Sequence, residues 1–419
     1  MDIRIEPAAL KGSVAAPPSK SEAHRLLICA ALADRPTDIM LNTVSNDIAA
    51  TITCLESMEA KIARINDCVT VSPAAAGERA VLNCGESGST LRFLLPVASA
   101  LFESVDVTGS GRLPERPLNM LIEQMKRHGC TFSNDKLPFT VTGRLSGGDF
   151  ELSGNVSSQF VSGLLLASPL FECDTRIRII GALESSGYVD LTVRAMADFG
   201  VSAEKTATAF CVDGGARYRS AGAVRVGGDW SNAAFWLCAG ALGMDVGVTG
   251  LDEESAQGDR QITKLLERFG ALEKHTDDAV IITSGELCGQ DIDVSQIPDL
   301  FPVLAAVGAC ARGKTRLYNA KRLRAKESDR IDSVASMLNA LGIRSEQTED
   351  SLTVFGGCVH GGTVDSRNDH RIAMAAAILS VRADSPVTIT GAEAVNKSYP
   401  AFFSDFNKLG GCAYVISNR

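Results

Sequence analysis

Eight basic residues stand at or close to helix starts expected from the sequence: Lys20, Arg25, Arg92, Arg116, Lys326, Arg330, Arg371 and Lys397. The N-terminus of a helix carries a partial positive charge, so cations are disfavoured there unless something anionic compensates them. Free backbone N–H groups, the helix dipole and a nearby lysine or arginine together bind phosphate or carboxylate groups. We therefore expect a strongly cationic site that binds more than one anionic group.

Two carboxylates accompany these cations. Asp299 follows Pro298 at the head of an apolar helix, and Glu327 lies between Lys326 and Arg330 in RAKESDRI, where a second helix is expected to open. An aspartate that faces several cations is a candidate general base, whereas a lone aspartate at a helix start is more simply an N-cap. Each cationic motif, taken alone, also fits a solvated side chain beside a capping residue.

The elements that would position these residues repeat along the chain. A helical run rich in small apolar residues occurs six times at intervals of about 70 residues, beginning at Ser19, Ser87, Ser157, Asp229, Pro298 and Asn368. A short alternating strand, a second amphipathic helix and further strands follow each run. In five copies the second helix ends in glycine, which fits a left-handed C-cap. The repeat predicts an α/β architecture whose sheets are covered by helices.

The repeat also predicts the domain organisation. The sixth unit stops at 414–416 without its last strand, while KGSVAAPP, from Lys11, offers an unmatched strand before the first helix. We expect this N-terminal segment to close the last unit. Two domains of three units follow, 19–227 and 228–419 together with 1–18, joined by a hinge of two strands. A ligand site is expected in the cleft between the two domains.

Composition excludes several classes of protein. The 419 residues are 45% apolar and 22% charged, as in globular proteins, and no apolar stretch reaches the ~18 residues of a membrane span. Twelve cysteines are scattered singly, which argues against a metal site or a redox dithiol. The net charge of −9 opposes nucleic-acid and membrane surfaces, and no nucleotide-binding glycine motif is present. The start of the chain resembles no signal peptide, so we expect a cytoplasmic protein.

Eight motifs in order carry a resemblance to a known family: PPSKSEAHR, ESGSTLR, RLPERP, SSQ, PD before an apolar helix, RAKESDR, DHRIAMA and NKSYP. They cover almost the whole chain and are similar to the motifs of the 5-enolpyruvylshikimate-3-phosphate synthases (3-phosphoshikimate 1-carboxyvinyltransferases). The resemblance implies an α/β fold of two similar globular domains, each of three βαβαββ units forming an inside-out α/β barrel. It also implies a monomer that uses no metal or cofactor.

The activity implied by the resemblance is transfer of the enolpyruvyl group of phosphoenolpyruvate to the 5-hydroxyl of shikimate 3-phosphate, with release of phosphate, in chorismate and aromatic amino acid biosynthesis. The motifs place shikimate 3-phosphate against Lys20, Ser21, Arg25, Ser157, Ser158, Gln159, Ser185, Asp299 and Lys326. They place phosphoenolpyruvate against Lys20, Gly88, Arg116, Gln159, Arg330, Arg371 and Lys397. Ser185 is placed only by its distance from Tyr188 in ESSGYVD.

The resemblance also suggests how protons move. The attacking hydroxyl loses a proton, the methylene carbon of phosphoenolpyruvate gains one, and the tetrahedral adduct returns a methyl proton as it expels phosphate. We assign Asp299 as the acceptor near the hydroxyl. Glu327 and Lys20 are the candidates at the methylene carbon and the leaving phosphate.

Four residues depart from common family patterns. Glu86 stands where many members have asparagine, Arg322 and Leu323 replace an asparagine with an aromatic residue nearby, and Phe93 replaces a proline. Glu86 adds a carboxylate near the expected phosphoenolpyruvate pocket, so sensitivity to the inhibitor glyphosate does not follow from the resemblance. Kinetic order and the extent of domain closure do not follow either.

Two alternatives stay open. A sister family transfers the same enolpyruvyl group to UDP-N-acetylglucosamine and usually carries a reactive cysteine before its Arg-Pro motif, whereas residues 109–114 contain none. A non-catalytic anion-binding protein with the same fold is the second alternative, and loss of carboxylates would favour it. The presence of both Asp299 and Glu327 favours an enzyme.

Overall fold

The computed structural model describes residues 1–276 and 278–417. The chain forms two compact units, one of Pro18–Val226 and one of Met1–Pro17 with Gly227–Arg419. Each unit has its own cluster of buried apolar residues. Within the described residues the strands form six four-stranded sheets.

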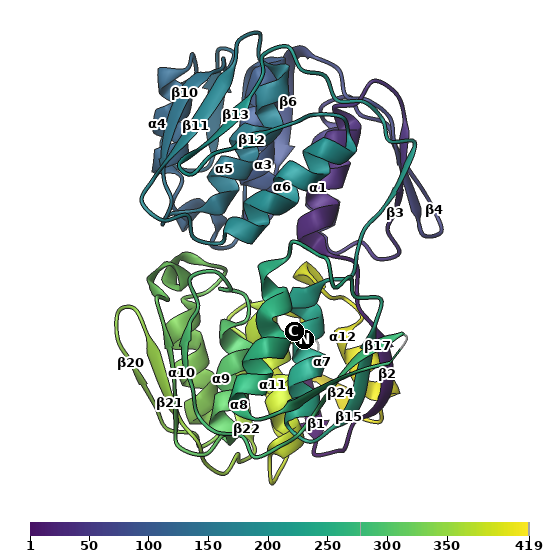
Figure 1. The fold of residues 1–419 in the computed structure, drawn as a ribbon, viewed down its shortest axis with the longest axis vertical. Coiled ribbons are helices and arrows are strands. Elements are labelled where there is room, and N and C mark those ends of the chain that lie inside the picture. Colours follow the sequence, from purple (N-terminus) through teal and green to yellow (C-terminus); the bar gives the residue numbers. More distant parts are fainter. Residues whose placement is uncertain (277, 418–419) are drawn as a thin grey trace. The chain divides into compact units, whose positions relative to one another are not determined.

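The unit of Pro18–Val226 is built around three helices that begin the first three repeats: α1 (Lys20–Ala31), α3 (Gly88–Leu101) and α5 (Ser158–Ala167) (Figure 1). Nearly all residues of these helices are buried, so they form the interior of the unit. Gly163 is needed where α5 meets α3, because a Cβ there would lie 2.1 Å from the carbonyl oxygen of Arg92. The absence of a side chain at Gly163 lets the middle of α5 pack closely against α3 near Arg92.

Three sheets and three amphipathic helices surround these helices. The helices are α2 (Asn46–Glu56), α4 (Asn119–Arg127) and α6 (Ser186–Asp198). The sheets have the orders β14-β3-β5-β4, β6-β7-β9-β8 and β10-β11-β13-β12. Their strands are β3 (Thr37–Met40), β4 (Ile62–Ile65), β5 (Cys68–Val71), β6 (Gly77–Asn83), β7 (Phe102–Thr108), β8 (Thr131–Phe132), β9 (Phe139–Thr142), β10 (Gly148–Ser153), β11 (Thr175–Ile180), β12 (Glu204–Lys205), β13 (Ala209–Val212) and β14 (Ala223–Arg225).

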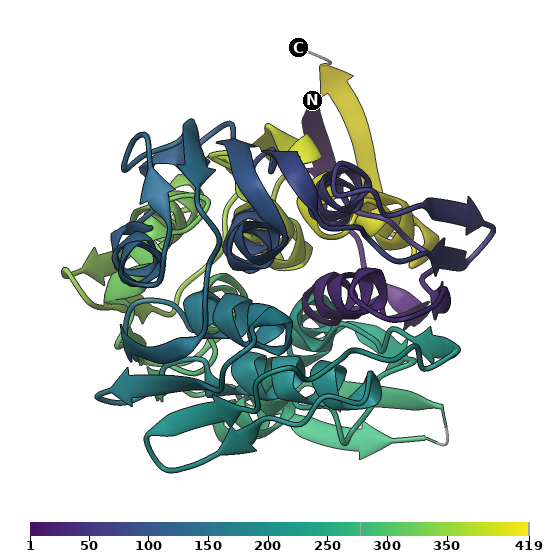
Figure 2. The ribbon, with the colours of Figure 1, turned by 90° about the horizontal axis from the view of Figure 1, so that it is seen from above.

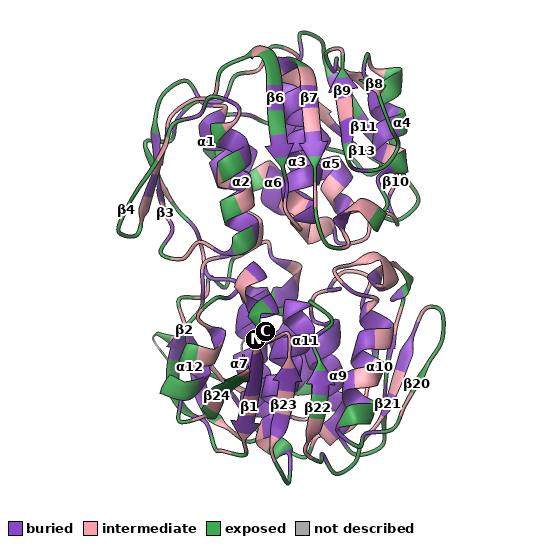
Figure 3. Ribbon diagram, turned by 180° about the vertical axis from the view of Figure 1, so that it is seen from behind, coloured by how far each residue is buried: buried purple, intermediate pink, exposed green. Residues whose placement is uncertain are grey.

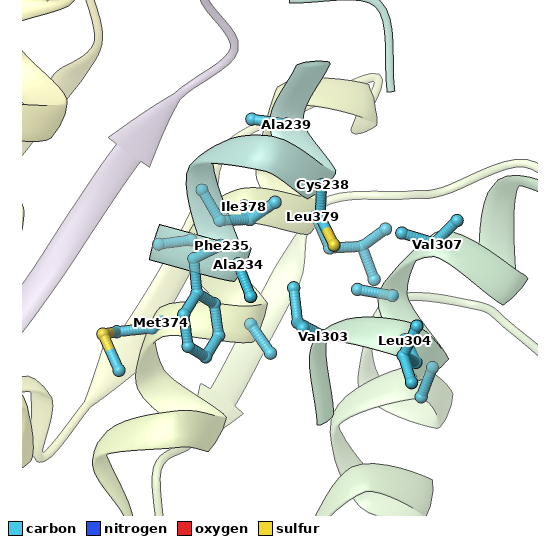
Figure 4. Packing of buried hydrophobic residues seen from close by; sticks show 14 of the residues in the cluster. Ala234, Phe235, Cys238, Ala239, Val303, Leu304, Val307, Met374, Ile378 and Leu379 are labelled. Carbon is cyan, nitrogen blue, oxygen red and sulfur yellow. The ribbon is translucent and has the colours of Figure 1, made fainter. Parts of the chain in front are cut away.

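The second unit has the same plan. Its interior helices are α7 (Trp230–Ala241), α9 (Phe301–Cys310) and α11 (His370–Leu379), and α9 and α11 are buried along almost their whole length (Figure 3). Phe235, Val303 and Ile378 come from these three helices and pack in one apolar cluster (Figure 4). Burying a side chain of this size contributes roughly 1.5–3 kcal/mol, so this core is a main source of stability.

The outer helices of this unit are α8 (Ile262–Phe269), α10 (Arg330–Ala340) and α12 (Phe402–Lys408). The sheets have the orders β16-β17-β15-β2, β18-β19-β21-β20 and β22-β23-β1-β24. Their strands are β1 (Asp2–Glu6), β2 (Lys11–Ala15), β15 (Asp245–Thr249), β16 (Leu272–His275), β17 (Ala279–Thr283), β18 (Asp291–Asp293), β19 (Lys314–Tyr318), β20 (Ser345–Gln347), β21 (Leu352–Phe355), β22 (Gly362–Asp365), β23 (Val387–Thr390) and β24 (Cys412–Ser417).

The N-terminal segment differs from the expectation in one respect. The N-terminal segment does close the last unit, as predicted, but KGSVAAPP is not the strand that does so, because its strand, β2, pairs in parallel with β15 in the sheet of the fourth repeat. The strand that enters the last sheet is β1, which pairs with β23 and with β24. The two ends of the chain therefore run side by side as β1 and β24 (Figure 2). Register between distant strands depends on tertiary packing, which one sequence does not reveal.

In the part of the chain that the structure describes, no helix is both long and apolar enough to cross a membrane.

Candidate active site

Caps fix the helix starts that carry candidate residues in each unit. Ser19, Ser87 and Ser157 cap α1, α3 and α5, and each side-chain oxygen accepts a backbone N–H group of the first turn. Asp229 and Asp369 do the same for α7 and α11. A capped N-terminus keeps the remaining N–H groups in a fixed direction, which suits the binding of anions.

Lys20 is the first residue of α1 and its ammonium group is paired. Its Nζ atom lies 2.8 Å from Oδ2 of Asp47 in the first turn of α2, and the two side chains are 14% and 12% exposed. Ser21 follows Lys20 and is half-buried. The pair orients the lysine and keeps it accessible to solvent at its edge. Nothing in the local sequence marks Asp47, since only the packing of α1 against α2 brings it near Lys20.

Arg25 lies one turn further along α1 and is almost fully buried. Its guanidinium donates to Thr192 Oγ1 at 2.7 Å, to Ser162 Oγ at 3.3 Å and to the backbone carbonyls of Ser21 and Tyr188 at 2.5 and 2.7 Å. These bonds use four of the five N–H groups of an arginine. Burial lowers the pKa of Arg25 to about 10, so the group stays charged at neutral pH. Arg25 therefore has one N–H group left for a ligand.

A second group of residues meets at the N-termini of α3 and α5. Arg92 donates to Oε1 of Gln159 at 2.8 Å, and Gln159 donates to Oγ of Ser89 at 2.9 Å. A Cβ on Gly88 would lie 2.6 Å from a terminal nitrogen of Arg116 and 2.9 Å from one of Arg92. Two guanidinium groups thus lie directly against the first residue of α3, and only glycine leaves them this space.

Three serines complete this side. Ser157 accepts the N–H group of Gln159 at 3.3 Å, so its oxygen acts as a cap, and Ser158 beside it is buried. Ser185 precedes α6 with a left-handed φ of 54° and is also buried. Because α6 carries Tyr188 and Thr192, which bind Arg25, the helix start at Ser185 is tied to α1.

In the other unit, Asp299 lies in a turn before α9 rather than at its cap. The N-cap position is Leu300, so the interpretation of Asp299 as a possible helix cap was wrong. Instead, its Oδ1 atom accepts a hydrogen bond from Arg330 at 2.7 Å and its Oδ2 atom accepts one from Arg371 at 3.0 Å. Two arginines therefore fix the plane and the charge of this carboxylate.

Arg330 is the centre of this group. Besides Asp299 it binds Oε2 of Glu327 at 2.8 Å and Oδ2 of Asp369 at 2.9 Å, and its side chain is 1% exposed. Arg330 opens α10, but Lys326 lies four residues before it in extended backbone. The expectation that both cations open one helix was therefore wrong for Lys326. The carboxylates of the protein itself supply much of the compensating charge that these cations need.

The pKa values of Asp299 and Lys326 are shifted for different reasons. Burial alone would raise the pKa of Asp299, but Arg371, Lys326 and Arg330 outweigh it and hold that pKa well below its usual range. Burial lowers the pKa of Lys326 to about 7 although Asp299 acts against it. Asp299 is consequently an ionised carboxylate at neutral pH, as a proton acceptor must be, and Lys326 is poised between its two forms.

Asp259 is a carboxylate that the sequence did not single out. It is fully buried in the turn Gly258–Gln261, and the hydroxyl of Ser231 donates to it. Burial, followed by the charge of Asp299, raises the pKa of Asp259 to about 7. Asp369 was recognised only as a cap, yet it also accepts from Ser328 and Arg330. Both residues lie before helices, but only the fold shows which cations they meet.

The remaining expected residues lie as follows. Lys397 is buried, and its Nζ donates to the carbonyl of Asn368 at 2.6 Å, one residue before Asp369. Arg112, the other arginine of RLPERPL, is partly exposed, 3.6 Å from Glu115. Among the residues that the structure describes, no group of three or more histidine, cysteine, aspartate or glutamate side chains has the arrangement of a metal site.

Three of the residues that depart from family patterns, Glu86, Arg322 and Phe93, have definite surroundings. The carboxylate of Glu86 lies against Gly111, whose Cβ would come within 2.7 Å of it, in the loop that leads to Arg116. Arg322 donates to the carbonyl of Ser295. The ring of Phe93 lies 4.7 Å below the guanidinium of Arg25, a distance at which a cation and an aromatic face attract each other.

Comparisons with known proteins agree on one family. The family model described as EPSP synthase (3-phosphoshikimate 1-carboxyvinyltransferase) matches residues 5–406. The chain is 42% identical over 415 residues to a 3-phosphoshikimate 1-carboxyvinyltransferase of Clostridium kluyveri, covering 98% of this chain and 97% of that protein. It is 38% identical over 417 residues to that of Methanocorpusculum labreanum, covering 98% and 99%.

Solved structures agree with this. The EPSP synthase of Acinetobacter baumannii superposes with a TM-score of 0.80 at 28% identity, over 99% of this chain and 100% of that chain. The enolpyruvyl transferase NikO of Streptomyces tendae reaches the same TM-score at 20% identity, over 99% and 98%, which is a likeness of fold. The prediction of two inside-out α/β domains is confirmed. The chain belongs to the EPSP synthase (3-phosphoshikimate 1-carboxyvinyltransferase) family.

Proposed function

We propose that the chain transfers the enolpyruvyl group of phosphoenolpyruvate to the 5-hydroxyl of shikimate 3-phosphate and releases inorganic phosphate, a step in the synthesis of chorismate and the aromatic amino acids. One observation carries the proposal. In a chain that matches the family over residues 5–406, Asp299 is held ionised between two buried arginines, Arg330 and Arg371. A fixed carboxylate among cations suits proton abstraction beside anionic substrates.

Shikimate 3-phosphate is bound by groups that cluster at the starts of α1, α5 and α6 and by two residues of the other unit. These are Lys20, Ser21, Arg25, Ser157, Ser158, Gln159, Ser185, Asp299 and Lys326. The buried position of Ser158 and Ser185 and the remaining N–H group of Arg25 support this role, because a phosphate needs directed donors. Arg25 contributes at most one N–H group, since its other four already bind the protein.

Phosphoenolpyruvate is bound by the cations around Gly88 together with those of the second unit. The set is Lys20, Gly88, Arg116, Gln159, Arg330, Arg371 and Lys397. The absence of a side chain at Gly88 supports close approach of a ligand to the N-terminus of α3, where Arg92 and Arg116 lie. Bringing two multiply charged anions together is the main electrostatic task, and these fixed cations perform it.

Three groups move protons. Asp299 accepts the proton of the 5-hydroxyl group as the hydroxyl oxygen attacks the substituted enol carbon of phosphoenolpyruvate. At the same time Glu327 or Lys20 supplies a proton to the methylene carbon. The tetrahedral adduct then loses a methyl proton as its C–O bond to phosphate breaks, which restores the double bond. The charge of Arg330 at 2.8 Å from Glu327 and the pairing of Lys20 with Asp47 support these roles by fixing both groups. Positioned proton transfer is worth about 10²- to 10⁴-fold in rate.

The sister reaction on UDP-N-acetylglucosamine is less well supported. Its family usually has a reactive cysteine before the Arg-Pro motif, and here the loop of residues 109–114 has none. The nearest cysteine, Cys130, lies beyond α4 and is buried, with its pKa raised to about 12 by that burial. A thiol of this kind is almost entirely protonated at neutral pH and is a poor nucleophile.

The test is phosphate release by the purified protein with phosphoenolpyruvate and either shikimate 3-phosphate or UDP-N-acetylglucosamine as acceptor. We expect release only with shikimate 3-phosphate, and its loss in Glu327→Gln. Release only with the sugar nucleotide would contradict the proposal. No release with either acceptor, from folded protein that still binds phosphoenolpyruvate, would favour a binding protein instead.

We further propose that the enzyme is a monomer in the cytoplasm and binds neither nucleic acid nor membranes. The net charge of −9 supports this, because it gives no extended basic surface for phosphate backbones or acidic lipids. Light scattering that gives a mass near 44.2 kDa is the expected result for the monomer, and twice that mass would contradict it.

A further inference from the structure

A chain of buried hydroxyl groups runs beneath the site in the unit of Pro18–Val226 and ends at a histidine. Nδ1 of His24 lies 2.7 Å from Oγ1 of Thr51, which lies 2.7 Å from Oγ1 of Thr90. Thr90 in turn lies 2.7 Å from Oγ of Ser87 and 3.3 Å from the carbonyl oxygen of Asp47. The four side chains in this hydrogen-bonded series are almost fully buried. They come from α1, α2 and the start of α3, so the hydrogen bonds link three helices.

The direction of the protons follows from what each atom can do. A carbonyl only accepts, so Thr90 donates towards Asp47 or towards Ser87 and must accept from Thr51. Thr51 has then used its one proton and accepts from His24. His24 is therefore protonated at Nδ1, and Nε2 carries a lone pair. The opposite direction would leave a buried N–H group at Nε2 for which the described residues give no partner, and such orphan donors are rare.

The charges around His24 favour the same neutral form. Lys20 and Arg25 lie on the same helix, while the groups next to the ring from α2 and α3 are the hydroxyl of Thr51 and the ring of Phe93, which is perpendicular to it. Burial first, and then the charges of Lys20 and Arg25, lower the pKa of His24 well below its usual range. A second proton on the ring would add a buried charge beside two cations. The ring thus acts as a fixed donor across the neutral pH range.

We propose that His24 is a positioning residue for the reaction: as a neutral Nδ1–H imidazole it orders the hydroxyls of Thr51 and Thr90 and so fixes Ser87 and Asp47. This inference rests on the proposed function, because its importance lies in the two ends of the chain. Ser87 caps α3 directly before Gly88, and Asp47 holds Lys20 at 2.8 Å. The start of the phosphoenolpyruvate-binding helix and the lysine of α1 are thereby held in one hydrogen-bonded unit.

Thr51→Val tests the link, since it removes the middle hydroxyl and keeps nearly the same shape. We expect kcat/KM for phosphoenolpyruvate to fall about three- to tenfold, the effect of one buried hydrogen bond, and Thr51→Ser to restore most of it. Thr37→Val is the matched control. Thr37 is equally buried and loses a hydroxyl contact of the same length, 2.7 Å to Ser220, but at β3 and away from the helix starts. It should lose similar stability and keep its kcat/KM.

The tautomer is tested separately by ¹⁵N NMR of protein labelled at its five histidines, with His24→Asn used to assign the signal. We expect a pyrrole-type shift at Nδ1 and a pyridine-type shift at Nε2 of His24 that do not change across the neutral pH range. The reverse pattern, or a ring that becomes doubly protonated near neutral pH, would overturn the inference. Unchanged kcat/KM in Thr51→Val would overturn it as well.

The two proposals fail differently. If the wild-type protein releases no phosphate with shikimate 3-phosphate, the proposed function is wrong. The histidine tautomer measured on the same sample still decides the hydrogen-bond network, because it does not depend on turnover.

Discussion

Arg330 donates a hydrogen bond of 2.7 Å to Oδ1 of Asp299, and the side chain of Arg330 is only 1% exposed. The same guanidinium binds Glu327 and Asp369, so one positive charge is shared among three carboxylates. A buried cation with several partners is costly to remove, because each carboxylate is then left with too little compensating charge. The position of the candidate base is therefore set by an arginine that the rest of the unit holds from three directions.

Arg330→Ala should lower the free energy of unfolding by about 3–5 kcal/mol, the range for loss of one partner of a buried ion pair. Urea unfolding measures it. Arg344→Ala is the control, because Arg344 and Glu346 form a pair with side chains 71% and 59% exposed, worth less than about 1 kcal/mol. Equal losses in the two variants would contradict the structural role of Arg330.

Gly88→Ala should weaken the binding of phosphoenolpyruvate without unfolding the protein. The new methyl group meets the ends of Arg116 and Arg92, which are flexible and can move aside, so the cations are displaced rather than the backbone. We expect KM for phosphoenolpyruvate to rise about tenfold or more, the effect of a weakened charged contact. Gly357→Ala, whose Cβ would come no closer than 3.5 Å to Ile343, should leave KM unchanged. A normal KM in Gly88→Ala would show that no ligand depends on these cations.

The affinity for shikimate 3-phosphate should depend on Lys326 above neutral pH. Its pKa of about 7 means that the free enzyme loses this cation as the pH rises, while the phosphate of the ligand is already largely doubly ionised. Calorimetry should therefore show weaker binding from about pH 7 to about pH 9, with proton uptake on binding. Lys326→Arg keeps its charge over this range and should remove the decline. A pH-independent affinity in the wild-type protein would contradict the proposed contact.

Asp259→Asn should change how stability depends on pH. The folded pKa of Asp259, about 7, lies above the value of roughly 3.9 in an unfolded chain, so the folded state keeps a proton that the unfolded state has lost. The stabilising effect is present below the unfolded pKa and is lost as the pH rises through the folded one. Between about pH 5 and about pH 8, the free energy of unfolding of the variant should rise by about 1–3 kcal/mol relative to that of the wild type.

Denaturation curves at both pH values measure this gain, and the exposed Asp291 offers the control Asp291→Asn, which should show none. A variant that follows the wild-type pH dependence would show that Asp259 is already ionised at about pH 5.

The sequence predicted the elements better than their connections. The six interior helices were visible because each is apolar on nearly every side and recurs at a constant interval, and this pattern depends only on local chemistry. The pairing of β2 with β15, and the insertion of β1 between β23 and β24, were not predicted. Strands of equal quality compete for these places, and only the packed structure decides between them.

The candidate site shows the same division. Cations at helix starts were recognisable because they violate the preference set by the helix dipole, which is a local rule. The carboxylates that bind them, Asp47 and Asp369, stand in positions where an aspartate is ordinary, as does the buried Asp259, so nothing in the local sequence marked their role. His24 was hidden for a related reason: its neighbours Thr51 and Thr90 are 27 and 66 residues away along the chain and meet it only in the fold.

The central claim is that Asp299 accepts the proton of the attacking hydroxyl, and phosphate release by Asp299→Asn tests it most directly. The variant keeps the shape of the side chain and one oxygen acceptor for the arginines, but it replaces the other oxygen by an amide NH₂ group and removes the base. With phosphoenolpyruvate and shikimate 3-phosphate at saturation, we predict that kcat falls by about 10²-fold or more, while Asp293→Asn, an exposed aspartate of the same unit, stays near wild type. A kcat of Asp299→Asn within a few-fold of wild type, from folded protein, would contradict the assignment.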